Sequence, residues 1–354
     1  MKKVVKYTVV VVFVIISLYF IQRLLMPKYM DDIVEGALIA EYYQDADNEV
    51  LKDHDIVFIG DCEVYENFSP TTLWEEYGLN TYIRGSAQQL IWQSYYLLEE
   101  TLQYETPDVV VFNVLAMKYD EPQNEAYNRM TIDGMRWSQA KVGSINASML
   151  EEENFLDYVF PLLRYHSRWS DISMSDFKYM FSKEQIAHNG YYMRVDTKGV
   201  TDVPEGRPLS NYQFGDNSYY YLDKMVELCK EKGVELVLVK APSLSPYWYE
   251  EWEVQMEDYA EKHNLMYINY LELIDEVGLD FMTDTYDLGL HLNLAGAEKL
   301  SKYFGKQMVD AFGLENRQSN EALSKEWEEK KEFYYGMKDA QFKELEEYGE
   351  IINY

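Results

Sequence analysis

The stretch from Asp55 to Glu63 constrains the fold more than any other part of the chain. It reads Asp-Ile-Val-Phe-Ile-Gly-Asp-Cys-Glu, so an apolar run of strand type ends on Gly60 and is followed directly by Asp61 and Cys62. Glycine adopts backbone angles that other residues avoid, so the chain can turn sharply at Gly60. The turn would leave two polar residues at the carboxyl end of a strand, where open α/β sheets hold their ligands.

Two interpretations of this turn are open. Backbone amides near the start of a following helix would favour negative charge on Cys62 and lower its pKa, as in a reactive thiol. The plain alternative is a strand and a turn that carry a small, half-buried cysteine. A second polar segment far downstream, from Asp284 to Asn293 with His291 inside it, favours the reactive site.

Apolar segments of strand length alternate with amphipathic segments from residue 53 onward. Strands separated by helices predict a parallel sheet with right-handed crossovers, in a three-layer α/β domain. Ser69 followed by Pro70 is typical of a helix start. We expect strands at residues 56–59, 82–83, 109–115, 234–239 and 266–268, and helices that begin near residues 69, 91, 217, 247 and 297.

Two regions depart from this alternation. Residues 118 to about 215 are rich in Met, Tyr, Arg and Asn without a clear period, which indicates a mostly helical insertion. Residues 316–354 are strongly charged, which indicates an acidic helical tail. The α/β domain itself is expected to span residues 53–315.

The amino-terminal segment resembles a membrane anchor. Lysines precede an apolar run that extends from residue 7 to residue 26, the length of a membrane-spanning helix, with Arg23 near its far end. A cleaved signal peptide is the alternative, but bulky residues occupy the place of a small-x-small cleavage pattern. We expect an uncleaved anchor at residues 1–28 and a partly helical stalk at 29–52. The lysines predict a single pass in the cell membrane, with a cytoplasmic amino terminus and an extracellular domain.

Composition narrows the possible partners. The chain has 32 basic and 62 acidic residues, a formal charge of −30, which argues against nucleic acid and against electrostatic docking on anionic lipid. The chain has two cysteines, and Cys229 shares a helical apolar face with Leu222, Met225 and Val226, as expected of a core thiol. No Cys/His cluster has the spacing of zinc ligands, so we expect no metal and no cofactor.

Three separated motifs together resemble the SGNH (GDSL-type) hydrolase superfamily. They are Gly60-Asp61-Cys62, Gly85 after the second strand, and an Asp and His291 just before the last helix of the domain. The sequence is most similar to the membrane-anchored extracellular branch, which includes DltD-like acyl-transfer proteins of the cell envelope. The resemblance implies a flavodoxin-like parallel sheet and, as partner, a membrane-bound O-acyltransferase.

The resemblance also implies roles for the site residues. Cys62 occupies the position of the nucleophilic serine, and His291 would act as general base and then general acid. The family carries its orienting Asp three residues before the His, where this chain has Leu288. Asp287 is the first candidate for that role and Asp284 the second.

The expected oxyanion hole consists of the Cys62 amide, Gly85 and Asn113. The family's Gly-x-Asn-Asp block is absent, so Asn113 could equally be a residue beside the core. Asp61 and Lys240 are possible substrate-binding residues, as are Arg164 and His166 in the insertion. The alternatives are a solvated lysine and a helix with surface ion pairs.

The sequence therefore predicts an extracellular acyltransferase or esterase with a Cys–His centre. Its substrate would be an acyl ester, with acetyl expected, of a cell-envelope or secreted polysaccharide. A plain esterase of small esters is one alternative. A catalytically degenerate scaffold or binding subunit of a polysaccharide-modification complex is the other, because serine is replaced and one oxyanion motif is missing.

Overall fold

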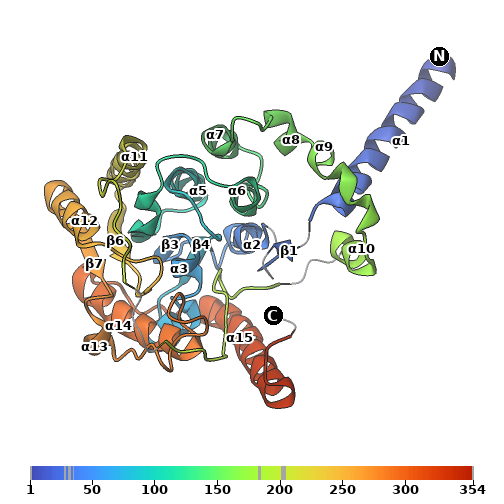
Figure 1. Ribbon diagram of the computed structural model, residues 1–354. Coiled ribbons are helices and arrows are strands. Elements are labelled where there is room, and N and C mark those ends of the chain that lie inside the picture. Colours follow the sequence, from blue (N-terminus) through green and yellow to red (C-terminus); the bar gives the residue numbers. More distant parts are fainter. Residues whose placement is uncertain are drawn as a thin grey trace.

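A five-stranded parallel sheet forms the centre of the molecule (Figure 1). The computed structural model describes residues 2–27, 29–30, 33–34, 36–181, 185–200 and 205–352. The strand order β4-β3-β5-β6-β7 is the flavodoxin-like order, and it confirms the predicted parallel α/β fold. The strands are β3 (Ile56–Gly60), β4 (Thr81–Gly85), β5 (Val109–Asn113), β6 (Glu235–Lys240) and β7 (Met266–Asn269).

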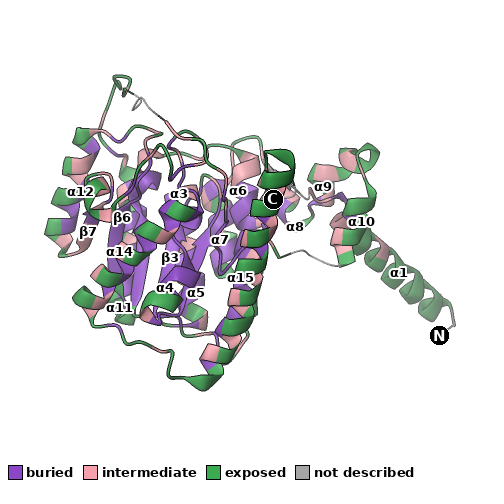
Figure 2. Ribbon diagram, turned by 90° about the horizontal axis from the view of Figure 1, so that it is seen from below, coloured by how far each residue is buried: buried purple, intermediate pink, exposed green. Residues whose placement is uncertain are grey.

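Helices cover both faces of this sheet and complete three layers. On β3, Ile56 and Phe58 pack into one apolar core, while Val57 and Ile59 pack into the other, as the two-residue period of a strand requires. The strands are buried almost throughout (Figure 2). One face carries α4 (Pro70–Tyr77) and α14 (Leu294–Phe312), and the other carries α5 (Ile91–Tyr104), α11 (Asp216–Lys232) and α12 (Glu250–His263).

Local sequence signals account for several element ends. Ser69 caps α4 because its Oγ accepts a hydrogen bond from the Thr72 amide, and Pro70 takes the first helical position. The strand expected at 109–115 instead ends at Asn113 and continues as the 3₁₀ helix η1 (Val114–Lys118). The residues of η1 before Lys118 are buried. The apolar run therefore predicted burial correctly, but the strand conformation predicted for its last residues was wrong.

The insertion is helical only in its first two thirds. It contains α6 (Glu125–Ile132), α7 (Gln139–Ser148), α8 (Phe155–Val159), α9 (Leu162–Tyr165), η2 (His166–Ser170) and α10 (Met174–Phe181). From residue 185 the chain is irregular, and it lies along the sheet edge, where the Ile83 amide donates to the Asn189 carbonyl at 2.8 Å. The parts of the expected insertion at 182–184 and 201–204 lie outside the described residues.

The amino-terminal helix α1 (Lys2–Leu25) projects from the body of the molecule (Figures 1 and 2). It is long and apolar enough to cross a membrane, by length and composition. Short strands β1 (Tyr29–Met30) and β2 (Ile33–Val34) follow. In the expected stalk, α2 (Ala37–Ala46) packs against β4 with its Tyr42 and Tyr43 buried, so this segment is part of the domain. Residues 1, 28, 31, 32 and 35 lie outside the described residues.

The expected acidic tail is a structural helix rather than a free extension. Trp327 on α15 (Glu321–Tyr348) stacks on Trp74 of α4, with ring centroids 5.0 Å apart. Gln341 is buried and donates a hydrogen bond to the Met193 carbonyl at 2.9 Å. The helix therefore ties the end of the chain to the irregular part of the insertion. A short helix α13 (Ile274–Val277) precedes α14, and residues 353–354 lie outside the described residues.

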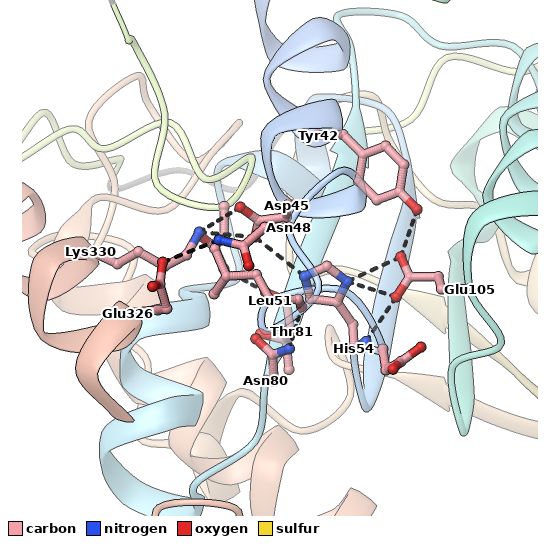
Figure 3. Close-up of polar contacts among 12 residues, drawn as sticks. Tyr42, Asp45, Asn48, Leu51, His54, Asn80, Thr81, Glu105, Glu326 and Lys330 are labelled. Atoms are coloured by element: carbon pink, nitrogen blue, oxygen red, sulfur yellow. Dashed lines mark hydrogen bonds and ion pairs between the residues drawn. The ribbon is translucent and has the colours of Figure 1, made fainter. Parts of the chain in front are cut away.

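A buried polar cluster lies just before β3, at the end of the sheet opposite the Cys62 turn (Figure 3). His54 contacts Glu105 through Nδ1 at 2.8 Å and Asp45 through Nε2 at 3.4 Å. Lys330 on α15 donates to Asp45 at 2.9 Å, so the cluster joins α2 and α15 to the sheet. Burial opposes a charge on His54, but the two carboxylates outweigh it and raise the pKa of His54 to about 9.

This cluster predicts a pH dependence of stability. A histidine whose folded pKa lies above its ordinary value of 6.5 stabilises the fold fully below that pH, and the effect is lost as pH rises through about 9. His54→Gln should therefore lower the free energy of unfolding by roughly 3 kcal/mol near pH 6 and by much less near pH 10. Denaturant unfolding in detergent at the two pH values measures this. His263→Gln is the control, and a difference for His54→Gln that does not change with pH would contradict the prediction.

Candidate active site

The turn that carries Cys62 is shaped by close packing after β3. Asp61 caps the short helix α3 (Cys62–Tyr65), and its Oδ1 accepts a hydrogen bond from the Glu63 amide at 3.2 Å. Gly60 belongs to β3 and has no positive φ, so the sharp turn does not depend on the backbone angles that we expected glycine to supply. A Cβ at Gly60 would lie 2.5 Å from Val64, so glycine is needed here for close approach. The turn leaves Cys62 partly exposed at the carboxyl end of the strand.

His291 lies immediately before α14 and is held by Asp287. Its Nδ1 donates to Asp287 Oδ2 at 2.6 Å, and its backbone amide donates to Oδ1 of the same carboxylate at 2.8 Å. The intervening Leu288 and Gly289 have φ values of 67° and 85°, and this tight loop folds the carboxylate back onto the ring. Asp284 instead accepts from Lys299 at 2.6 Å, so the structure pairs His291 with Asp287.

Cys62 and His291 lie close enough to shift each other's pKa by charge and by a side-chain hydrogen bond. Because Nδ1 faces Asp287, Nε2 is the nitrogen left for the thiol. Among the described residues Nε2 has no partner with normal hydrogen-bond geometry. We therefore describe the pair as adjacent but not aligned, an arrangement that is common before substrate binds.

The pKa of Cys62 is shifted in the opposite direction from the one expected of an activated thiol. Burial raises the pKa of Cys62, and the opposing effect of His291 is smaller. A helix of four residues offers too small a dipole to lower it. Burial also opposes charge on His291, but Glu66, Cys62 and Asp287 outweigh it and raise its pKa well above the ordinary value. The site therefore stabilises the imidazolium that forms when His291 takes the thiol proton.

Glu66 is a second carboxylate beside His291 that the sequence analysis missed. Its Oε2 lies 3.5 Å from His291 Nδ1 and accepts a hydrogen bond from the Tyr286 hydroxyl. Burial raises the pKa of Glu66. Glu66 comes four residues after Cys62, one helical turn away, and that spacing is the signal that could have identified it.

A fully buried ion pair joins the Cys62 turn to the end of β6. Lys240, at the end of β6, donates to both carboxylate oxygens of Glu63 at 3.0 and 2.9 Å. Asn113 donates one N–H to Asp61 Oδ1 and the other to Glu63 Oε2, each at 3.0 Å. In this arrangement Asn113 has no N–H left for a substrate oxyanion, and Lys240 does not face a substrate. Burial, followed by the charge of Glu63, raises the pKa of Asp61 to about 6.

Gly85 and Lys118 lie near the same turn. Gly85 ends β4, and Lys118 follows β5. Gly85 pairs in register with Gly60, and a Cβ there would lie 3.1 Å from the Gly60 carbonyl oxygen. Lys118 ends η1, after β5. Burial lowers its pKa, and the charges of Asp61, Glu63 and Cys62 oppose that shift. Lys118 is thus a cation near the turn that the sequence analysis did not select.

The structure does not bring Arg164 and His166 to this site. They lie on α9 and η2 next to α1, well separated from α3 (Figures 1 and 2). Arg164 is exposed and donates to Glu125 at 2.8 Å, and exposed His166 contacts the Leu163 carbonyl at 2.9 Å. In the described parts of the chain, no group of three His, Cys, Asp or Glu side chains could hold a metal ion.

Comparisons with known proteins give only distant likenesses. No family model matches, and no curated protein matches. A protein from Bacteroides fragilis provisionally described as an acylhydrolase is 14% identical, with a TM-score of 0.39 over 77% of this chain and 95% of its own. A GDSL-like lipase from Bacteroides thetaiotaomicron is 14% identical, with a TM-score of 0.36 over 78% of this chain and 98% of its own. These likenesses are too weak to transfer an activity.

The geometry predicts that the two cysteines differ in reactivity. Cys62 should react with iodoacetamide faster than Cys229, because it is partly exposed beside a proton acceptor. Cys229 is 1% exposed, and burial raises its pKa to about 12. Mass spectrometry of peptides alkylated in the folded protein measures both rates. His291→Gln should remove most of the advantage of Cys62, and equal rates in the unsubstituted protein would contradict the assignment.

Proposed function

We propose that this chain is a membrane-anchored enzyme that cleaves or transfers acyl esters through Cys62, His291 and Asp287. One observation carries the proposal: His291 is held through Nδ1 by Asp287 at 2.6 Å, while its other nitrogen is left for the thiol at the end of β3. Cys62 and His291 are more than two hundred residues apart in the sequence. They meet at the carboxyl ends of the strands. Such an arrangement of nucleophile, base and orienting carboxylate is the recurring machinery of acyl transfer.

The chemistry proceeds in two steps. His291 takes the proton of Cys62, and the sulfur attacks the ester carbonyl carbon. The tetrahedral intermediate collapses to a thioester as the alkoxide leaves with that proton from His291. Water or a sugar hydroxyl then attacks the thioester and transfers a proton to His291. The departing sulfur takes that proton back, which releases the thiol together with an acid or a new ester. The amide of Cys62 and Gly85 are the proposed oxyanion donors.

The surroundings of His291 favour this sequence of proton transfers. Asp287 and Glu66 lie on the Nδ1 side of the ring, so both stabilise the imidazolium formed in each step. Burial raises the pKa of Cys62, so the site disfavours a free thiolate, and the charge and hydrogen bond of His291 oppose that shift. A thiol that keeps its proton until His291 removes it behaves like the serine of the resembled family.

The substrate class follows from the resemblance together with α1. We propose an acyl ester, with acetyl expected, of a cell-envelope or secreted polysaccharide, and an extracellular position for the domain. A membrane-bound O-acyltransferase is the proposed partner, because it would supply the acyl group that Cys62 takes up in the first step and passes to a sugar hydroxyl in the second. No cofactor is needed in this scheme, since side chains carry every step.

A non-catalytic role is the second candidate, and two observations favour it. Burial raises the pKa of Cys62, and both N–H groups of Asn113 are engaged away from a substrate. One missing oxyanion donor typically costs a few kcal/mol in the transition state. A scaffold subunit of a polysaccharide-modification complex would retain the fold with this weakened site.

Incubation with an activated acetyl ester should form a thioester on Cys62. Intact-mass measurement of the full chain in detergent should show a gain of one acetyl group. Cys62→Ala should abolish the adduct, and Cys62→Ser should keep only part of the activity because an alcohol is harder to deprotonate. Cys229→Ala is the matched control and should acetylate normally. An adduct that persists in Cys62→Ala, or no adduct at all, would favour the scaffold.

The two candidate carboxylates allow a paired test of the triad. Asp287→Asn should reduce ester hydrolysis by about 10²- to 10⁴-fold, because the amide no longer holds His291 in the productive tautomer. Asp284→Asn should change the rate little, since Asp284 contacts Lys299 rather than His291. Steady-state rates with a small chromogenic ester, compared with rates of transfer to a glycan acceptor, also separate esterase from transferase. Equal losses in the two variants would refute the assignment of Asp287.

A further inference from the structure

Exposed apolar side chains gather on one part of the insertion. We call residues 155–181 the collar, which comprises α8, α9, η2 and α10. Elsewhere in the described part of the chain, apart from α1, large exposed apolar residues are more widely spaced; three of them, Tyr335, Phe342 and Tyr348, lie on α15. In the collar they follow one another closely: Leu156, Phe160, Leu163, Trp169, Met174, Phe177 and Phe181. Exposed apolar groups concentrated in this way mark an interaction surface.

The spacing of these residues places them on common faces. Met174, Phe177 and Phe181 lie at positions i, i+3 and i+7 of α10, which is one stripe of a helix. On the opposite side of α10, Asp176 turns inward and accepts from Arg168 at 3.2 Å. The helix is therefore amphipathic with its apolar side directed outward, which is the reverse of a helix that covers a core.

The collar lies against the base of α1, where that helix joins the body of the molecule (Figures 1 and 2). Arg23 on α1 donates to the Met180 carbonyl at 2.8 Å, and Arg168 donates to the Leu25 carbonyl at 2.8 Å. Helix α1 also contacts α9, η2 and α10. The side chains of α1 from residue 3 to residue 21 are almost all exposed, so its apolar surface continues into that of the collar.

The charge and the aromatic content of the collar fit a lipid surface. The collar has three basic residues (Arg164, Arg168, Lys178) and three acidic ones (Asp157, Asp171, Asp176), so its net charge is zero in a chain of −30. Repulsion from anionic headgroups is therefore weaker at this surface than the charge of the whole chain would give. Trp169 is 75% exposed, and tryptophan is enriched at the boundary between lipid and water.

We propose that the collar lies in the membrane interface around the exit of α1, with its apolar face at the boundary of headgroups and acyl chains. Amphipathic helices bind bilayers in this way by burying one face a short distance into the lipid. The proposal rests on the proposed anchoring of α1, and it adds a second attachment that holds the domain in one orientation. Arg164 and His166 then lie at the lipid surface rather than in a substrate cleft.

Photocrosslinking to lipid tests this docking in the full chain. Trp169 and Phe181 are replaced, one at a time, by p-benzoylphenylalanine, and each protein is reconstituted in nanodiscs of phosphatidylcholine. After irradiation and removal of free lipid, intact mass should show a gain of one lipid at each position. Tyr220 on α11 is the matched negative control, because it is an exposed aromatic on the side of the molecule away from α1 (Figure 1).

The same crosslinker placed at Phe13 on α1 distinguishes a failure of docking from a failure of anchoring. A lipid adduct at Phe13 without one at Trp169 and Phe181 would overturn the docking while leaving the anchor intact. No adduct at any position would overturn the anchor and the docking together. In cells, a protein adduct in place of lipid at Trp169 would show that a partner protein covers the collar, which also overturns the proposal. None of these results depends on acyl transfer.

Discussion

The buried pair of Glu63 and Lys240 is the interaction on which the rest of the site depends. Both side chains are fully buried, and breaking such a pair by removing one partner typically costs several kcal/mol. The pair is tolerated because Asn113 and the Ala241 carbonyl satisfy further hydrogen-bonding groups around it. It joins the carboxyl ends of β3, β5 and β6, where the register of the sheet brings these residues to one level. The Cys62 turn therefore rests on a rigid base.

His291 is held in place by other contacts than the Cys62 turn. His291 is placed by a loop whose conformation depends on left-handed backbone at Leu288 and Gly289, not on a strand. Backbone hydrogen bonds from the irregular part of the insertion hold this loop, since the Leu288 amide donates to the Lys198 carbonyl at 2.9 Å. The helix α15 holds that same irregular segment through Gln341. The end of the chain thus contributes indirectly to the position of the base.

The two ends of the sheet carry different polar groups. One end carries the thiol and the imidazole, whereas the other carries the His54 cluster that joins α2 and α15 to the sheet. Residues 26–36 join α1 to α2, so the connection from the amino-terminal helix to the domain is short. If the collar lies at the lipid surface as proposed, the end of the sheet that carries Cys62 would keep a defined height and direction relative to the membrane. Such an arrangement suits a substrate that is itself attached to the cell envelope.

Elements whose burial shows in their periodicity could be predicted from the sequence. It predicted the parallel sheet, the cap at Ser69, the core position of Cys229 and the apolar helix near the amino terminus, because these depend on local pattern and on apolar burial. The pairing of the polar groups could not be predicted in this way and became visible in the folded chain. The structure placed Asp287 rather than Asp284 on His291, added Glu66, engaged Asn113 and Lys240 beneath the turn, and moved Arg164 and His166 away. A carboxylate or amide can satisfy its hydrogen bonds with many partners, and the choice depends on which distant segments the sheet brings together.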